Sequence, residues 1–109
     1  MTCALYKLEI FVPKSHFEQV RQALWSVDAG HIGRYDRCLS WSRVNSCWRP
    51  LEGTDPFDGT IGQLSKSEEV KIEVCCLGQR LEETLTAVKA AHPYEEPVIY
   101  ALPVLGTGL

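Results

Sequence analysis

Two stretches of this chain repeat one pattern, KLEIFVPKSHFEQVRQAL at Lys7–Leu24 and KIEVCCLGQRLEETLTAV at Lys71–Val88, with residue 71 lying 64 positions after residue 7. At this offset Lys7, Glu9, Glu18 and Ala23 match Lys71, Glu73, Glu82 and Ala87. Each copy begins with alternating apolar and polar residues, as a half-buried strand does. Each then changes to the spacing of an amphipathic helix. The repeat therefore predicts a strand followed by a helix, twice.

The apolar positions predict which faces are buried. The expected strand faces carry Tyr6, Leu8, Ile10 and Val12 in the first copy and Val70, Ile72 and Val74 in the second. The expected helix stripes carry Phe17, Val20, Leu24 and Val27, then Leu81, Leu85 and Val88. Ser15 is the expected N-cap of the first helix, with Glu18 completing a capping box. Gly30 is expected to end that helix, and Pro93 must end the second.

Two further strands are predicted, at Arg34–Trp48 and Val98–Val104. The order is then βαββαβ, an α+β fold of the ferredoxin-like (split βαβ) type, with an antiparallel sheet and both helices on one face. The other face stays open, and we expect Phe11, Trp41 and Ile99 on it. An open apolar face commonly meets a partner, so a homo-oligomer, dimer or trimer, is expected.

Composition narrows the class of protein. The 109 residues fit one domain, 1–109, with a long Gly- and Pro-rich loop at about 50–66 between the halves. A net charge of −3 without a basic tract argues against nucleic-acid binding. No apolar run approaches the roughly 20 residues that span a bilayer, and no secretory signal is recognisable. We therefore expect a cytoplasmic protein that binds no membrane, with its five cysteines reduced.

Three motifs resemble one known domain: GHIGRY at 30–35, PLEGTDPFDGTIG at 50–62 and HPYEEP at 92–97. They occur in the same order in the PII- and CutA-like domain inserted in proteins of the Nif-three family, the NGG-interacting-factor or type 2 GTP cyclohydrolase I homologues. The resemblance covers nearly the whole chain and implies a stand-alone version of that domain. The family's metal ligands belong to a larger flanking domain, so neither they nor a cyclohydrolase activity carry over to any residue here, and no catalytic residue is assigned.

The HPYEEP segment is the most suggestive for chemistry. His92 and Glu95 are the candidate ligands of a divalent metal ion, and Tyr94 and Glu96 are further ligand-binding candidates. A structural role is the other interpretation, because Pro93 and Pro97 fix a chain reversal. Adjacent glutamates in a strand also point to opposite sides and cannot both chelate one ion.

His31 and Gly33 of GHIGRY are ligand-binding candidates, since Gly30 and Gly33 suggest positive φ or a close approach of the backbone to a ligand. A simple turn is the other interpretation of this segment. Glu52 of the long loop is another ligand-binding candidate. In the predicted topology the two helix-to-strand turns lie at opposite ends of the sheet, so His31 and His92 should be far apart. A common site would then be an inter-subunit cleft built from the loop, HPYEEP and GHIGRY.

Two functions remain open at this point. The first is a small oligomeric binding or regulatory module that binds a metal ion, a small metabolite or a protein partner and is not itself a complete enzyme. PII and CutA imply a trimer for it. The alternative is a metal-dependent hydrolase that uses His92 and Glu95 or Glu96.

Overall fold

The two copies of the repeat form matching units in the computed structural model, which describes residues 3–108. The first unit is β1 (Leu5–Pro13), the 3-10 turn η1 (Lys14–His16) and α1 (Phe17–Ser26). The second is the end of β3 (Ser65–Leu77), η2 (Gly78–Arg80) and α2 (Leu81–Ala91). Both the turns and the helices begin 64 positions apart, which is the offset of the sequence repeat. The repeat is therefore present in the structure.

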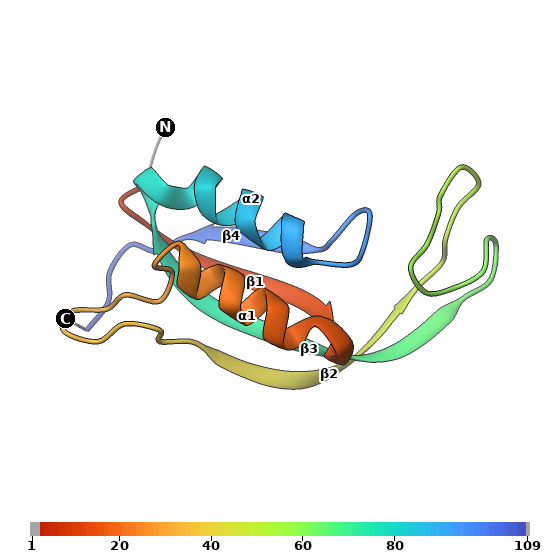
Figure 1. Ribbon diagram of the computed structural model, residues 1–109, viewed down its shortest axis with the longest axis horizontal. Helices are drawn as coiled ribbons and strands as arrows, with labels where there is room; N and C mark the ends of the chain where they lie inside the picture. The colour runs from red at the N-terminus through yellow and green to blue at the C-terminus, as the bar shows by residue number, and fades with distance from the viewer. Residues whose placement is uncertain (1–2, 109) are drawn as a thin grey trace.

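Two edge strands complete the sheet, β2 (Ser40–Trp48) and β4 (Ile99–Pro103). The strand order is β2-β3-β1-β4, and each neighbouring pair is antiparallel. Figure 1 shows both helices on the same face of this sheet. The predicted ferredoxin-like fold is confirmed, and the last strand lies within one residue of each predicted end.

The core lies between the sheet and the two helices. The predicted faces supply it, because Leu8, Ile10 and Val12 of β1 and Val20 and Leu24 of α1 are all 0% exposed. Predicted positions of the second unit are also buried: Val70, Ile72, Val74 and Val88. All five cysteines are free thiols, and Cys76 is part of this core.

The open face of the sheet differs in part from the prediction. Phe11 lies on it, opposite Lys71, with its ring edge-on to Tyr100 at 6.2 Å. The placement of Trp41 and Ile99 there was wrong. Trp41 pairs with buried Ile72, and Ile99 pairs with buried Ile10. Register partners share a face, so both residues lie on the helix side, where Trp41 packs 5.2 Å from the ring of Phe17.

The start of α1 differs from the predicted capping box. His16 is the N-cap residue and makes no side-chain cap bond. The Ser15 hydroxyl lies 2.8 Å from Nδ1 of His16, while the Glu18 carboxylate accepts hydrogen bonds from Arg21 and Gln22. The intervening 3-10 turn moves Ser15 out of capping position.

The end of α1 also falls earlier than Gly30. Asp28 takes the left-handed conformation (φ 61°), and the Ala29 N–H donates to the Leu24 carbonyl (3.0 Å). This is a Schellman cap with aspartate in the usual glycine position. Gly30 does have the expected positive φ of 84°, as does Gly33 at 60°. A Cβ at Gly30 would lie 2.3 Å from the Cys38 carbonyl oxygen, so close backbone packing requires glycine there.

Pro93 ends α2 as predicted: His92 is its C-cap, in extended conformation (ψ 136°). The β2 strand begins at Ser40 rather than Arg34, because the preceding residues form a turn in which Ile32 and Tyr35 bridge. No helix among residues 3–108 is long and apolar enough to cross a membrane.

Beyond the end of β1, β2 and β3 continue as a two-stranded hairpin, from the Asn45–Glu68 pair to the Trp48–Ser65 pair. We call residues 45–68 the arm. It projects from the sheet beside the segment that follows α2 (Figure 1). The molecule is therefore elongated, with extents of 46 × 28 × 22 Å.

Candidate functional site

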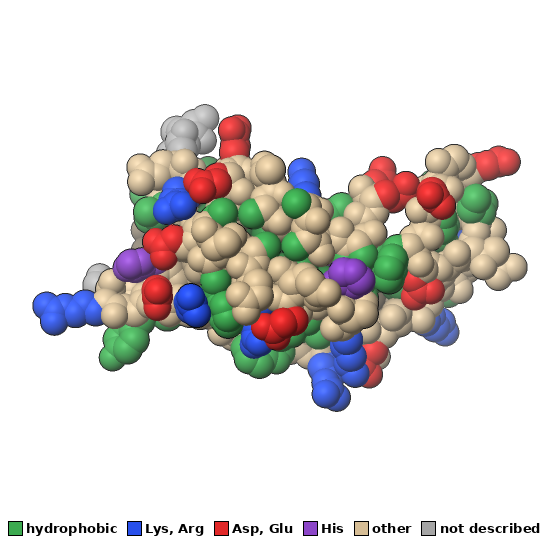
Figure 2. All heavy atoms as spheres, viewed as in Figure 1, with side chains coloured by type: hydrophobic (Ala, Val, Ile, Leu, Met, Phe, Trp, Pro, Cys, Tyr) green, Lys and Arg blue, Asp and Glu red, His purple; other side chains and the backbone are tan. Residues whose placement is uncertain are grey.

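A cleft of about 470 Å³ lies where the arm meets the sheet and the HPYEEP segment. Five aromatic residues and four acidic residues line it: Phe11, Trp48, Phe57, Tyr94 and Tyr100, with Asp58, Glu69, Glu95 and Glu96. Arg49 is the one basic residue in the lining. In Figure 2 acidic side chains gather over the arm, on the right of the molecule. The cleft joins two of the three segments that the sequence pointed to.

His92 fixes the HPYEEP segment to the sheet. The residue is 7% exposed, Nε2 donates to the Phe11 carbonyl (2.7 Å), and Nδ1 accepts the Tyr94 N–H (3.2 Å). This pair of partners requires a neutral ring with its proton on Nε2. Burial lowers the pKa of His92, and the bond to the Phe11 carbonyl opposes that shift in part. Both ring nitrogens are thus engaged by the backbone.

Tyr94 connects the segment to the base of the arm. Its hydroxyl donates to Oε2 of Glu69 (2.6 Å), the residue of β3 that pairs with the last residue of β1. Burial, and then the bond to this carboxylate, raises the pKa of Tyr94 above its ordinary value. The ring lies 6.0 Å from Trp48 and 5.9 Å from Phe57. One side chain therefore contacts the β2 strand of the arm, the arm loop and the β3 residue at the base of the arm.

The two glutamates of the segment have different roles. Glu95 accepts a hydrogen bond from the Asp55 backbone N–H of the arm loop (2.9 Å), while Glu96 lines the cleft without a side-chain partner among the described residues. Glu52 lies in the same loop and is not part of the lining. The segment therefore holds the arm in place and presents one unengaged carboxylate.

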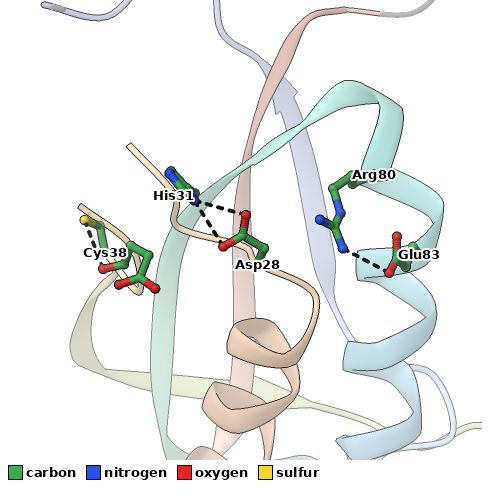
Figure 3. Close-up of polar contacts among 6 residues, drawn as sticks. Asp28, His31, Cys38, Arg80 and Glu83 are labelled. Carbon is green, nitrogen blue, oxygen red and sulfur yellow. Dashed lines mark hydrogen bonds and ion pairs between the residues drawn. The ribbon is translucent and has the colours of Figure 1, made fainter. Parts of the chain in front are cut away.

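His31 and Gly33 lie at the other end of the sheet, as the topology predicted. Gly30 donates to the Cys75 carbonyl beside the start of β1, whereas His92 binds the carbonyl of Phe11 near its end. Figure 3 shows His31 turned toward Asp28, to which it is paired at 3.1 Å, and the separate Arg80–Glu83 pair on the neighbouring helical segment. The structure does not bring GHIGRY to the cleft within one chain.

A metal at His92 and Glu95 stays a prediction. Residues 3–108 contain no group of three or more His, Cys, Asp or Glu side chains placed to hold a metal ion. His92 would also have to give up a backbone hydrogen bond to free a ring nitrogen. Its present role is to position the residues that follow it.

The sequence analysis missed Glu69, Trp48 and Phe57. Glu69 is 4% exposed, yet strand alternation places it on the polar face with Lys71 and Glu73. No local pattern marks it as buried, because its partner Tyr94 lies 25 residues further along the chain. Aromatic residues flanking a turn-rich loop could have suggested Trp48 and Phe57.

No protein-family model matches this chain. Two curated proteins named GTP cyclohydrolase 1 type 2 homolog, from Halalkalibacterium halodurans and Bacillus subtilis, are 42% and 39% identical to it over 107 and 103 residues. The matches cover 98% and 94% of this chain but only 29% and 28% of those proteins. A crystal structure of a Bacillus cereus protein related to NIF3 gives a TM-score of 0.83 at 35% identity, covering 97% of this chain and 27% of that one.

The chain is a homologue of one segment of these Nif3-related proteins. The resemblance carried by the three motifs is thereby confirmed. Two more distant structures share the fold of this Nif3-related segment: CutA1 from Shewanella sp. SIB1 (TM-score 0.72, 19% identity, 98% and 87% of the two chains) and Arabidopsis thaliana PII bound to citrate (0.61, 22%, 94% and 78%). The PII- and CutA-like fold class is confirmed with them.

Proposed function

We propose that this Nif3-related segment is a small oligomeric binding or regulatory module that holds a ligand in the cleft between the arm and HPYEEP. The observation that carries the proposal is the cleft itself. Its volume of about 470 Å³ lies in the range of small-molecule sites, and its walls are mainly apolar, with five aromatic side chains and a few polar groups. One protein of the same fold, the Arabidopsis PII, is described with citrate bound.

The contacts of His92 support a binding module over a metal-dependent hydrolase. A ligating histidine needs a free ring nitrogen, and here both nitrogens have backbone partners. The same contacts hold the cleft wall in one position, which favours binding because little order is lost when a ligand enters. In this proposal the module is not a complete enzyme by itself.

Assembly is the second part of the proposal. The outer edges of β2 and β4 have no strand partner within residues 3–108. The open face beside β4 carries Phe11, Tyr100 and Leu102, of which Tyr100 and Leu102 are 56% and 41% exposed. Unpaired edges and exposed apolar side chains are surfaces that a second copy can cover. We propose a homo-oligomer in the cytoplasm, where five free thiols stay reduced.

A thermal-shift screen with a cleft-filling variant tests the binding proposal. Val98 lines the cleft, is 45% exposed, and contributes only its backbone carbonyl to the bond from Phe11. Val98→Trp fills the cleft, and Leu105→Trp is the matched control on a fully exposed residue outside it. The panel holds nucleotides, carboxylic acids, amines and divalent cations.

We expect at least one compound to raise Tm of the wild type and of Leu105→Trp but not of Val98→Trp. No shift with any compound, together with a monomeric mass in light scattering, would contradict the proposal.

A further inference from the structure

The negative charge of the chain is concentrated in the cleft. The chain has 14 acidic and 11 basic residues, and the cleft lining holds four acidic residues and one basic residue. Ten acidic and ten basic residues remain elsewhere, so the rest of the chain is balanced. Arg49 forms no ion pair among the described residues and does not neutralise the lining. A cleft whose charged side chains are mostly of one sign, between walls of low dielectric constant, attracts ligands of the opposite charge.

Glu69 lacks the cationic partner that its neighbours have. On the same strand, Glu68 pairs with Lys14 (2.7 Å) and Glu73 pairs with Lys7 (2.6 Å), and both of these glutamates are more exposed. Glu69 is 4% exposed and has no ion pair. Its Oε2 accepts from Tyr94, while Oε1 has no hydrogen-bond partner among residues 3–108. Oε1 is therefore open to the N–H donor of a cationic ligand, which would supply the charge partner that this carboxylate lacks.

The aromatic walls favour the same kind of ligand. The rings of Trp48 and Phe57 lie within 6.0 Å of Tyr94 on the arm side, and Phe11 and Tyr100 meet edge to face on the sheet side. Aromatic faces attract cations, most strongly where water is excluded. Inorganic cations gain little from such walls, whereas an alkyl cation also buries its carbon chain against them.

We propose that the cleft binds a small organic cation, an alkylammonium or alkylguanidinium group, whose N–H donors reach Oε1 of Glu69 and the carboxylate of Glu96. The assignment rests on the proposed function and adds the ligand class to it. The alkyl part lies against Trp48, Phe57 and Tyr94. A cleft of this volume takes a small molecule rather than a folded partner.

Isothermal titration calorimetry tests the ligand class with four probes of equal chain length. They are n-butylammonium, n-butylguanidinium, neutral n-butanol and anionic butyrate. The two cations are expected to bind, and butanol and butyrate are not. In a two-dimensional amide NMR spectrum the cations should shift the Trp48 indole N–H, which is assigned with Trp48→Phe. The other two tryptophans, Trp25 and Trp41, do not line the cleft and serve as internal controls.

Charge-neutral variants locate the site. Glu69→Gln keeps an acceptor for the Tyr94 hydroxyl, and Glu96→Gln removes no intramolecular contact, so at least the second keeps its fold. Each should weaken cation binding by about tenfold, the usual effect of losing a charged hydrogen-bond partner. Glu52→Gln makes the same charge change in the arm loop outside the cleft and should bind as the wild type does.

Equal binding of butyrate and butylammonium, or an equal loss in Glu52→Gln, would overturn the assignment of an organic cation. Butyrate binding that Val98→Trp abolishes would overturn the ligand class alone and leave the binding module standing. If none of the four probes and no compound of the thermal-shift panel bound, both proposals would fail.

Discussion

Glu9 and Glu73, which occupy the same position in the two copies of the repeat, lie directly opposite each other on the central strands β1 and β3. The pseudo-two-fold axis that relates the two halves therefore passes between them. The neighbouring pairs show the same symmetry. The offset of 64 residues relates Lys7 to Lys71 and Phe11 to Cys75, so the Lys7–Cys75 pair is equivalent to the Lys71–Phe11 pair. Like charges directly across a sheet are unfavourable. Here Lys7 binds both carboxylates, and Lys71 binds Glu9 (3.5 Å).

The same symmetry makes Lys14 and Gly78 equivalent positions with different surroundings. Gly78 is buried and donates its N–H to the Ala4 carbonyl (2.9 Å), and a Cβ on it would lie 1.7 Å from the Cys3 carbonyl oxygen. Lys14 is exposed. We expect Gly78→Ala to lower the free energy of unfolding by about 1–3 kcal/mol, as overpacking does, and Lys14→Ala to change it little. Urea unfolding followed by circular dichroism measures both. Equal stability of the two variants would contradict the close approach at Gly78.

The arm should depend on the bond between Tyr94 and Glu69. Tyr94→Phe leaves a buried carboxylate without its donor, which costs about 1–3 kcal/mol. Tyr35→Phe is the matched control, because Tyr35 is 75% exposed and its hydroxyl has no partner among the described residues. Chemical denaturation gives the free energies of unfolding. Amide hydrogen exchange in residues 45–68 should be faster in Tyr94→Phe than in the wild type or in Tyr35→Phe. Unchanged exchange in the arm would show that the aromatic contacts and the bond between Glu95 and the Asp55 N–H hold it without the Tyr94 hydroxyl.

The sequence predicted the fold well because the spacing of apolar residues within each strand and helix determines which of them are buried. Leu8 and Ile10 alternate with charged residues, and Val20 and Leu24 share a helix stripe, so their burial follows from spacing alone. The face of the sheet on which Trp41 lies does not follow from spacing. A shift of one residue in register reverses that face, and β2 begins only after an irregular turn. The motifs indicated two of the segments around the cleft, but the predicted site was an inter-subunit cleft that also included GHIGRY. The buried acceptor of the cleft, Glu69, is contacted by Tyr94 of the HPYEEP segment, 25 residues away, and no local pattern encodes that contact.

A substitution at the C-terminal cap of α1 is expected to stabilise the fold. Asp28 holds a left-handed conformation (φ 61°) that glycine adopts without strain. Asp28→Gly should raise the free energy of unfolding by about 0.5 kcal/mol, because relief of strain exceeds the added flexibility of the unfolded chain. The bond to His31 is exposed and contributes little. Asp36→Gly, at a residue without positive φ, is the control and should not stabilise. A lower Tm for Asp28→Gly would contradict this interpretation of the helix end.

His92 should make stability depend on pH in a defined direction. Its pKa in the folded chain lies below the ordinary 6.5, because burial disfavours the imidazolium. As pH falls through 6.5, the unfolded chain takes up a proton at this position before the folded chain does. Its contribution to stability is therefore complete above 6.5 and is lost as pH falls toward the folded pKa.

His92→Gln isolates that contribution, since the amide N–H can still donate to the Phe11 carbonyl but the side chain does not titrate. At neutral pH the variant should be less stable than the wild type by about 1 kcal/mol, the usual value of a hydrogen bond lost on substitution. The difference should shrink as pH falls below 6.5. His16, His31 and all carboxylates are present in both proteins, so their titration largely cancels in the comparison. A difference that stays constant across this range, or grows toward acid, would mean that His92 accepts a proton in the folded state and that its Nδ1 is not held by the Tyr94 N–H.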